Sequence, residues 1–314
     1  MTKRYFRSLS NGPRVVALVA LGGAATLCVA GCHDIIEEHF SSPPDRAVTW
    51  TDSNPADDND PPESFPAGEA PRCSGAYTFF YPTDLGGPDG TARHPVLTWG
   101  NGTNSNACAY SSALTTLARW GYVVIAANSP STGDGTQVLA AAQHMLSENS
   151  NPASVFFNKL DTAKFASIGH SQGAGGAVKA AIASNNLIKT VVTLSLSDPV
   201  FFTLIGQTAP DTSLLSVPIF FVRGGADFIA SEPGSHAYWD GVPGGAAKAS
   251  LKGADHNNLT AAGGYVTAWL EYTLKGDGYA RGAFVGDPPE IAERGDDPMD
   301  PEDPWADVEL KNLP

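Results

Sequence analysis

The feature that most constrains this chain is the segment Gly169-His170-Ser171-Gln172-Gly173, which has the form G-x-S-x-G. An apolar run at 165–168 precedes it and predicts a strand, and the small-residue run to about Ala183 predicts a helix. Such a turn is tight, holds its serine in a strained conformation, and leaves room only for glycine on either side. The segment therefore predicts Ser171 as a nucleophile exposed at the helix N-terminus.

Apolar strands alternate with helices through the middle of the chain. We expect strands at 76–81, 95–99, 122–127, 165–169, 190–196, 217–222 and 248–252, and helices at 110–120, 137–146, 171–183, 235–239 and 262–274. Strands that are apolar on both faces and separated by helices indicate a parallel sheet covered on both sides. The predicted fold class is therefore α/β, with a mostly parallel central sheet.

A serine hydroxyl is a weak nucleophile until a base takes its proton. With a serine at this kind of turn, the acid and then the histidine follow in chain order. Only His236 and His256 follow Ser171. We choose His256 as the base because it follows a predicted strand, whereas His236 falls in a predicted helix and is interpreted as a surface residue. His170 is expected to support the turn by packing or by a hydrogen bond.

Two aspartates are candidates for the acid. Asp227 directly follows the apolar strand at 217–222, and Asp198 follows the preceding strand. Either strand end can supply the acid, and we favour Asp227. Asp255 is adjacent to His256, but its side chain would point away from the base.

An oxyanion hole needs two backbone N–H groups. One is expected from Gln172, the residue after the nucleophile. The other is expected from the glycine-rich loop at 100–103, and we choose Asn101, with Gly102 beside it in contact with the substrate.

The charge and the remaining motifs exclude other functions. The 19 Lys and Arg against 33 Asp and Glu give a net charge of −14, which argues against a nucleic-acid partner. No H-E-x-x-H, P-loop or strand-following G-x-G-x-x-G is found, so we expect no metal and no organic cofactor.

The N-terminus predicts export. Four basic residues precede an apolar run of sixteen residues at 15–30, which is short for a membrane span and typical of a signal peptide over 1–31. The stretch Val29-Ala30-Gly31-Cys32 resembles a bacterial lipoprotein processing site, which implies a lipid on Cys32 and a membrane anchor. The residue after it, His33, is not the Asp that signals inner-membrane retention, which favours the outer membrane. The alternatives are a retained membrane helix and a free secreted enzyme.

Composition divides the rest of the chain into three parts. Residues 32–68 are rich in Pro, Asp and Ser and are predicted to be a disordered tether. Residues 69–275 are nearly neutral and are predicted to form the catalytic domain. Residues 276–314 form an acidic C-terminal extension whose alternating end, 305–310, predicts a strand that packs on the domain.

Two cysteines, Cys73 and Cys108, remain after the signal and the lipidation site are set aside. Export places them in a compartment that permits disulfides, and we expect them to be bridged. The alternative is a pair of buried free thiols.

The segments HPVLTWGNGT, GHSQGAGG, VPIFFVRGGADFIA and KGADHNN, in this order over 73–275, resemble α/β-hydrolases of the cutinase-like, poly(ethylene terephthalate) hydrolase type. More distantly they are similar to chlorophyllases and dienelactone hydrolases. The resemblance implies the α/β-hydrolase fold, an oxyanion role for Asn101 and a place in the substrate cleft for Ile229. This family often has Met where this chain has Gln172, an aromatic residue at Asn101, and a Trp near Asp198; without that Trp, an aromatic polyester is a weaker expectation.

We therefore expect an exported, monomeric serine hydrolase that cleaves carboxylic esters of small, lipid or polymeric substrates through Ser171, His256 and Asp227. The alternatives are an acyltransferase with the same three residues, a peptidase, and a non-catalytic binding lipoprotein at the cell surface.

Overall fold

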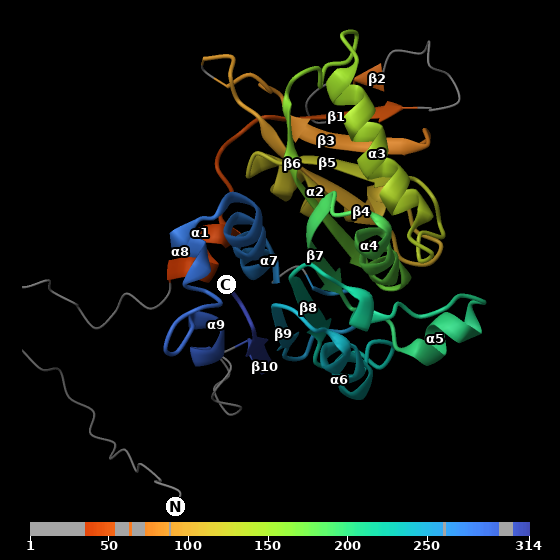
Figure 1. Cartoon of the computed structure of the whole chain (residues 1–314), viewed down its shortest axis with the longest axis vertical. Helices are drawn as coiled ribbons and strands as arrows, with labels where there is room; N and C mark the ends of the chain where they lie inside the picture. Colours follow the sequence, from red (N-terminus) through yellow and green to blue (C-terminus); the bar gives the residue numbers. More distant parts are fainter. Residues whose placement is uncertain (1–34, 54–62, 65–72, 88, 260–261, 295–303) are drawn as a thin grey trace, which may run out of the picture. The chain divides into compact units, whose positions relative to one another are not determined.

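The computed structural model describes residues 35–53, 63–64, 73–87, 89–259, 262–294 and 304–314. Its strands form one sheet in the order β10-β9-β8-β7-β6-β4-β5-β3-β1-β2 (Figure 1). The central strands β5, β4, β6, β7, β8 and β9 are parallel, and the strands at both ends of the sheet are antiparallel. The strands are β1 (Val48–Ser53), β2 (Glu63–Ser64), β3 (Tyr77–Pro82), β4 (His94–Gly100), β5 (Val123–Ala127), β6 (Leu160–His170), β7 (Ile188–Leu194), β8 (Ile219–Gly224), β9 (Ala246–Leu251) and β10 (Trp305–Lys311).

Helices cover both faces of this sheet. Successive strand residues point to opposite faces, so that Phe220 joins the core that contains Trp269 of α7, and Phe221 joins the core that contains Val178 of α4. The helical elements are α1 (Ile35–Ser41), η1 (Ala107–Tyr110), α2 (Ser111–Arg119), α3 (Thr136–Ser150), α4 (Gln172–Ala183), α5 (Pro199–Leu204), η2 (Thr212–Leu214), α6 (Glu232–Gly241), α7 (Gly263–Leu270), η4 (Glu271–Lys275), α8 (Gly278–Arg281) and α9 (Glu290–Glu293). The mostly parallel α/β sheet covered on both faces is confirmed.

The expected disordered tether is wrong for the part of 32–68 that the structure describes as α1 and β1. Strand β1 pairs antiparallel with β3 along its whole length, from Val48 opposite Pro82 to Ser53 opposite Tyr77. The Phe40 side chain of α1 is buried in the core. The surrounding Pro and Asp residues dominate the composition and conceal these two short segments. The rest of the predicted tether, residues 32–34, 54–62 and 65–68, lies outside the described residues.

The C-terminal end of the chain closes one edge of the sheet. Strand β10 pairs antiparallel with β9, and Trp305 is fully buried. The Trp305 indole donates a hydrogen bond to Glu37 Oε1 at 3.1 Å and so joins β10 to α1. A strand therefore forms where the alternating pattern predicts one.

The predicted signal peptide, Cys28 and the predicted lipidation site Cys32 lie outside the described residues. Within the described ranges, no helix is both long enough and apolar enough to cross a membrane.

Candidate active site

The predicted site residues gather at one edge of the sheet. Four parallel strands end just before the predicted site residues. The loop at 100–103 follows β4 and Ser171 follows β6, while Asp227 follows β8 and His256 follows β9. Carboxyl ends of parallel strands share an edge, and in open α/β sheets that edge is where ligands bind. The topology therefore brings together residues that are far apart in the sequence.

The turn at Ser171 has the strained geometry that its sequence predicts. Ser171 has φ 57° and ψ −127°, outside the regions that non-glycine residues usually occupy. A Cβ at Gly169 would lie 2.2 Å from the Gly173 carbonyl oxygen, and a Cβ at Gly173 would lie 2.3 Å from the carbonyl oxygens of Gly100 and Asn101. Both glycines are thus required by close backbone contacts, and α4 begins directly after the serine.

Ser171, His256 and Asp227 form a continuous chain of hydrogen bonds. The distance from Ser171 Oγ to His256 Nε2 is 2.8 Å, and that from His256 Nδ1 to Asp227 Oδ2 is also 2.8 Å. The carboxylate can only accept, so the proton of the neutral imidazole lies on Nδ1. His256 Nε2 is then free to accept the proton of the serine.

The Asp227 carboxylate is held ionised by its partners. Burial of its side chain raises its pKa, but hydrogen bonds from His256 and from the Ala230 amide outweigh burial and lower the pKa to about 2. Its Oδ1 accepts the amides of Ile229 at 2.8 Å and Ala230 at 3.0 Å, which leaves Oδ2 directed at the imidazole.

The other candidates for the acid and for the base form different interactions. Asp198 precedes α5 and accepts hydrogen bonds from the amide and hydroxyl of Ser231. Asp255 accepts the amides of the two residues that follow His256, within its own turn. His236 lies on α6 beside Lys248.

His170 connects three parts of the site. Its Nε2 lies 2.7 Å from the His256 carbonyl oxygen, which can only accept, so Nε2 carries the proton. Its Nδ1 then accepts from the Tyr110 hydroxyl at 3.0 Å, and the Tyr110 oxygen accepts the Gly102 amide at 3.0 Å. Burial lowers the pKa of His170 and favours the neutral ring that this arrangement needs. Tyr110 belongs to no recognisable sequence motif. It reaches the site only through the fold, from its position just before α2.

Asn101, whose backbone N–H is the one expected in the oxyanion hole, is fully buried in the structure. Its side chain donates to the carbonyl oxygens of Ala127 and Ser129, and among the described residues it does not line the cavity above Ser171. Gly102 and Thr103 line that cavity. The exposed part of the loop therefore begins at Thr103. The path of the loop backbone decides this, and the sequence alone does not determine that path.

The side chain of Gln172, where the family often has methionine, holds neighbouring loops in place. Its Oε1 accepts the Gly133 amide at 3.1 Å and the Gln207 side-chain amide at 3.0 Å, and its Nε2 donates to the Pro130 carbonyl oxygen. The side chain is therefore held by these loops, and the backbone N–H of Gln172 belongs to the first turn of α4.

A cavity of about 240 Å³ opens above Ser171. His256, Gly102 and Thr103 form its polar side, and Phe201, Phe202, Ile205 and Ile229 form its apolar side. Ile229 therefore lies where the resemblance places a cleft residue. The α5 residues were missed because an apolar segment after a strand carries no signal of its position beside Ser171.

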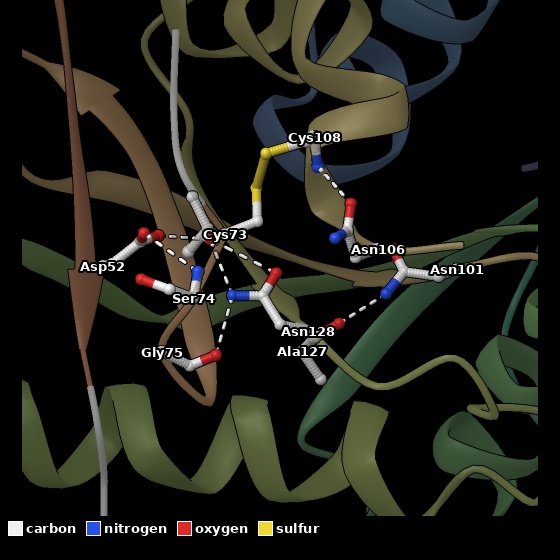
Figure 2. The surroundings of a disulfide bond; sticks show 10 residues. Asp52, Cys73, Ser74, Gly75, Asn101, Asn106, Cys108, Ala127 and Asn128 are labelled. Carbon is white, nitrogen blue, oxygen red and sulfur yellow. Dashed lines mark hydrogen bonds between the residues drawn. A yellow bond between two sulfur atoms is a disulfide. The ribbon is translucent and has the colours of Figure 1, made fainter. Parts of the chain in front are cut away.

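A disulfide joins Cys73, just before β3, to Cys108 in η1 (Figure 2). In the same region the side-chain amide of Asn101 donates a hydrogen bond to the Ala127 carbonyl oxygen, and the side-chain oxygen of Asn106 accepts one from the backbone amide of Cys108. The disulfide thus ties the segment after β4 to the segment before β3. A disulfide closing a 35-residue separation stabilises by about 4 kcal/mol in the chain-entropy model, and it fits an exported protein.

Among the described residues, one group has the atoms that a metal ion could bind: Glu232, His236 and Glu309, with ligand atoms within 4.8 Å of one another. The buried Lys248 ammonium lies between them, 3.2 Å from Glu232 Oε1 and 2.5 Å from Glu309 Oε1. The chain itself therefore supplies the cation of this cluster, and none of these residues lines the cavity.

Comparison with known proteins supports the resemblance noted in the sequence. A search among curated proteins finds none that matches. The family model described as PET hydrolase-like matches residues 67–295, which is more than half of the chain and includes Ser171, Asp227 and His256. The match also agrees with the mostly parallel sheet and its covering helices. The chain therefore belongs to the PET hydrolase-like family.

Proposed function

We propose that the protein is an exported carboxylic ester hydrolase that acts through a covalent acyl-enzyme on Ser171. The observation that carries the proposal is the hydrogen-bonded chain from Ser171 through His256 to the ionised Asp227, opening into a cavity with one apolar side. Membership of the PET hydrolase-like family supports hydrolysis of ester bonds in general.

In the acylation step the Ser171 oxygen forms a bond to the ester carbonyl carbon, and His256 Nε2 takes the serine proton. Collapse of the tetrahedral intermediate breaks the carbon–oxygen bond to the alcohol, which leaves with that proton. In the second step a water molecule gives its proton to His256 and attacks the acyl carbon. The serine oxygen leaves and recovers the proton, which releases the acid. Asp227 holds the imidazole in the required tautomer and stabilises its cation.

The proposed oxyanion hole consists of the backbone amides of Gln172 and Thr103. The Gln172 amide lies in the first turn of α4, where N–H groups have no partner within the helix. The Gly102 amide is already bonded to Tyr110, and Thr103 is the next residue of the loop that lines the cavity. We therefore propose Thr103 in place of Asn101.

The experiment that tests the function is hydrolysis of 4-nitrophenyl esters from acetate to long acyl chains by wild type and Ser171→Ala. The matched control is Ser167→Ala, a buried serine of β6 that does not line the cavity. We expect turnover by wild type and the control but not by Ser171→Ala. If folded wild type does not turn over any ester, the function is wrong. Faster transfer of the acyl group to an added alcohol than to water would instead favour an acyltransferase.

The proposal includes a lipid on Cys32 after removal of residues 1–31, as the sequence predicts. Mass spectrometry of the mature N-terminus in a bacterial host tests it. A diacylated and N-acylated cysteine is expected, and an unmodified N-terminus would make the protein a free secreted enzyme.

A further inference from the structure

A second hydroxyl group lies beside the candidate nucleophile. Ser197, in the segment that follows β7, has its Oγ 3.3 Å from Ser171 Oγ. The residue is only 4% exposed, and it lines the cavity above Ser171. Buried polar groups are normally hydrogen-bonded, and the one partner that this hydroxyl has among the described residues is the oxygen that is proposed to react.

The direction of this hydrogen bond follows from the bonds around it. The Asp227 carboxylate keeps the proton of the neutral imidazole on His256 Nδ1, so that Nε2 can only accept. The single proton of the Ser171 hydroxyl is therefore directed at Nε2, at 2.8 Å. Because the Ser171 oxygen still has a lone pair with which to accept, the Ser197 hydroxyl is the donor of the bond between the two serines.

The position of Ser197 is fixed through its backbone. Its carbonyl oxygen accepts a hydrogen bond from the hydroxyl of Tyr238, a buried residue of α6, at 2.9 Å. The amide of the next residue, Asp198, donates to the Ile229 carbonyl oxygen at 2.8 Å. The segment is thus attached both to α6 and to the loop after β8. A donor that is held in place in advance needs no reorganisation when the reaction begins.

A donor to Ser171 Oγ acts unequally on the two steps of the proposed reaction. The hydrogen bond is already made in the free enzyme, so acylation gains little from it. In the acyl-enzyme, Oγ is the bridging oxygen of an ester, whose lone pair is delocalised toward the carbonyl and accepts weakly. After water has attacked, the bond from the acyl carbon to Oγ breaks and its electron pair goes to Oγ. The Ser197 hydroxyl then donates to an oxygen that gains negative charge, while His256 Nε2 returns the proton to it.

We propose that Ser197 is a further catalytic residue, whose hydroxyl donates to Ser171 Oγ and speeds the departure of that oxygen from the acyl-enzyme. This inference rests on the proposed ester hydrolase function and adds a residue to its second step. Ser197 is not a second nucleophile, because its one partner in the described part of the chain is a hydroxyl and not a base.

The test measures the two steps separately, with enzyme in excess over dissolved 4-nitrophenyl butyrate. Release of 4-nitrophenol reports acylation, and decay of the butyryl adduct, followed by mass spectrometry of acid-quenched protein, reports deacylation. Wild type is compared with Ser197→Cys, whose thiol is a weaker donor, and with Ser197→Ala, which has none. The control is Ser250→Ala in β9. It removes a buried hydroxyl that has no hydrogen-bond partner among the described residues and does not line the cavity.

We expect acylation of Ser197→Ala to stay within about two-fold of wild type, and its butyryl adduct to decay about ten-fold more slowly, as for the loss of one hydrogen bond. Ser197→Cys should lie between the two, and Ser250→Ala should match wild type in both steps. Unchanged decay of the adduct in Ser197→Ala would overturn the proposal.

Equal losses in both steps would also overturn it, because they would mean that Ser197 only supports the position of Ser171. Failure of the proposed function is distinct from either result, since wild type would then release no 4-nitrophenol and form no adduct.

Discussion

The two sides of the cavity above Ser171 are built in different ways. On the polar side, His256, His170 and Tyr110 line the cavity. Together with Asp227 they are joined by hydrogen bonds whose directions are fixed by carbonyl and carboxylate acceptors. On the apolar side, α5 contributes side chains that lack any such bonds and continue outward into an exposed surface. Under the proposed function, the polar side carries out the chemistry and the apolar side contacts the substrate.

The largest effect should come from breaking the polar side at Asp227. Asp227→Asn removes the acceptor that holds the proton on His256 Nδ1, and we expect kcat for dissolved butyrate to fall by roughly 10⁴-fold. Asp198→Asn, at the neighbouring strand end, should cost less than about ten-fold, because that carboxylate bonds Ser231 and not the imidazole. Steady-state kinetics of both variants measure the difference. The reverse order of losses would make Asp198 the acid.

The pH dependence of stability tests the same carboxylate without substrate. Its folded pKa of about 2 lies below the ordinary value of 3.8, so the stabilisation is present above about pH 4 and is lost as the pH falls toward 2. The difference in the free energy of unfolding between wild type and Asp227→Asn should therefore shrink by about 2 kcal/mol between pH 5 and pH 2. Denaturant unfolding at both pH values measures it. A difference that stays constant would mean that the carboxylate is not held ionised by the fold.

Tyr110→Phe removes a hydroxyl that holds the polar side together without bonding Ser171 or His256 Nε2. The change leaves the Gly102 amide and His170 Nδ1 without their shared partner, so the loop beside Thr103 loses a fixed position. We expect kcat to fall about ten-fold while KM changes little, because the loop is proposed to act on the transition state. Tyr279→Phe, a change at a tyrosine that does not line the cavity, is the control. An increase in KM alone would show that Tyr110 serves binding rather than positioning.

The smallest effect should come from the apolar side. Ile205→Ala shortens one wall of the cavity, and we expect KM for octanoate esters to rise about three-fold, with little change for acetate. A chain-length series of 4-nitrophenyl esters measures it. An equal change for acetate and octanoate would place the acyl chain elsewhere.

Much of the fold could be predicted from the sequence, because its strands are apolar on both faces and its helices are not. Strand β8 and helix α4 are recognisable by these local patterns alone. Strand β1 is not recognisable in this way, because its short alternating segment lies among Pro and Asp residues. Its pairing with β3 is also a contact between segments distant in the sequence. The helix predicted at 262–274 begins as α7 and continues as the π-helix η4, a change in backbone hydrogen bonding that residue periodicity does not reveal.

The candidate site was predictable where a residue follows a strand directly. Ser171, Asp227 and His256 each come just after a parallel strand, so their convergence follows from the order of the strands. Which backbone amide of the loop at 100–103 faces the oxyanion is not predictable from the sequence, because the path of a loop depends on contacts such as the Gly102–Tyr110 bond. A supporting role for His170 was predictable, but its partners Tyr110 and His256, and the place of α5, depend on tertiary contacts that no single segment contains.

The most direct test of the central claim is to identify the residue that a fluorophosphonate modifies. The Ser197 hydroxyl lies 3.3 Å from that of Ser171 and lines the same cavity, so Ser197 is the alternative residue that the reagent could modify. Mass spectrometry of the digested protein should find one adduct, on Ser171, which forms much more slowly in Asp227→Asn. A folded protein with no adduct, or an adduct on Ser197, would contradict the account.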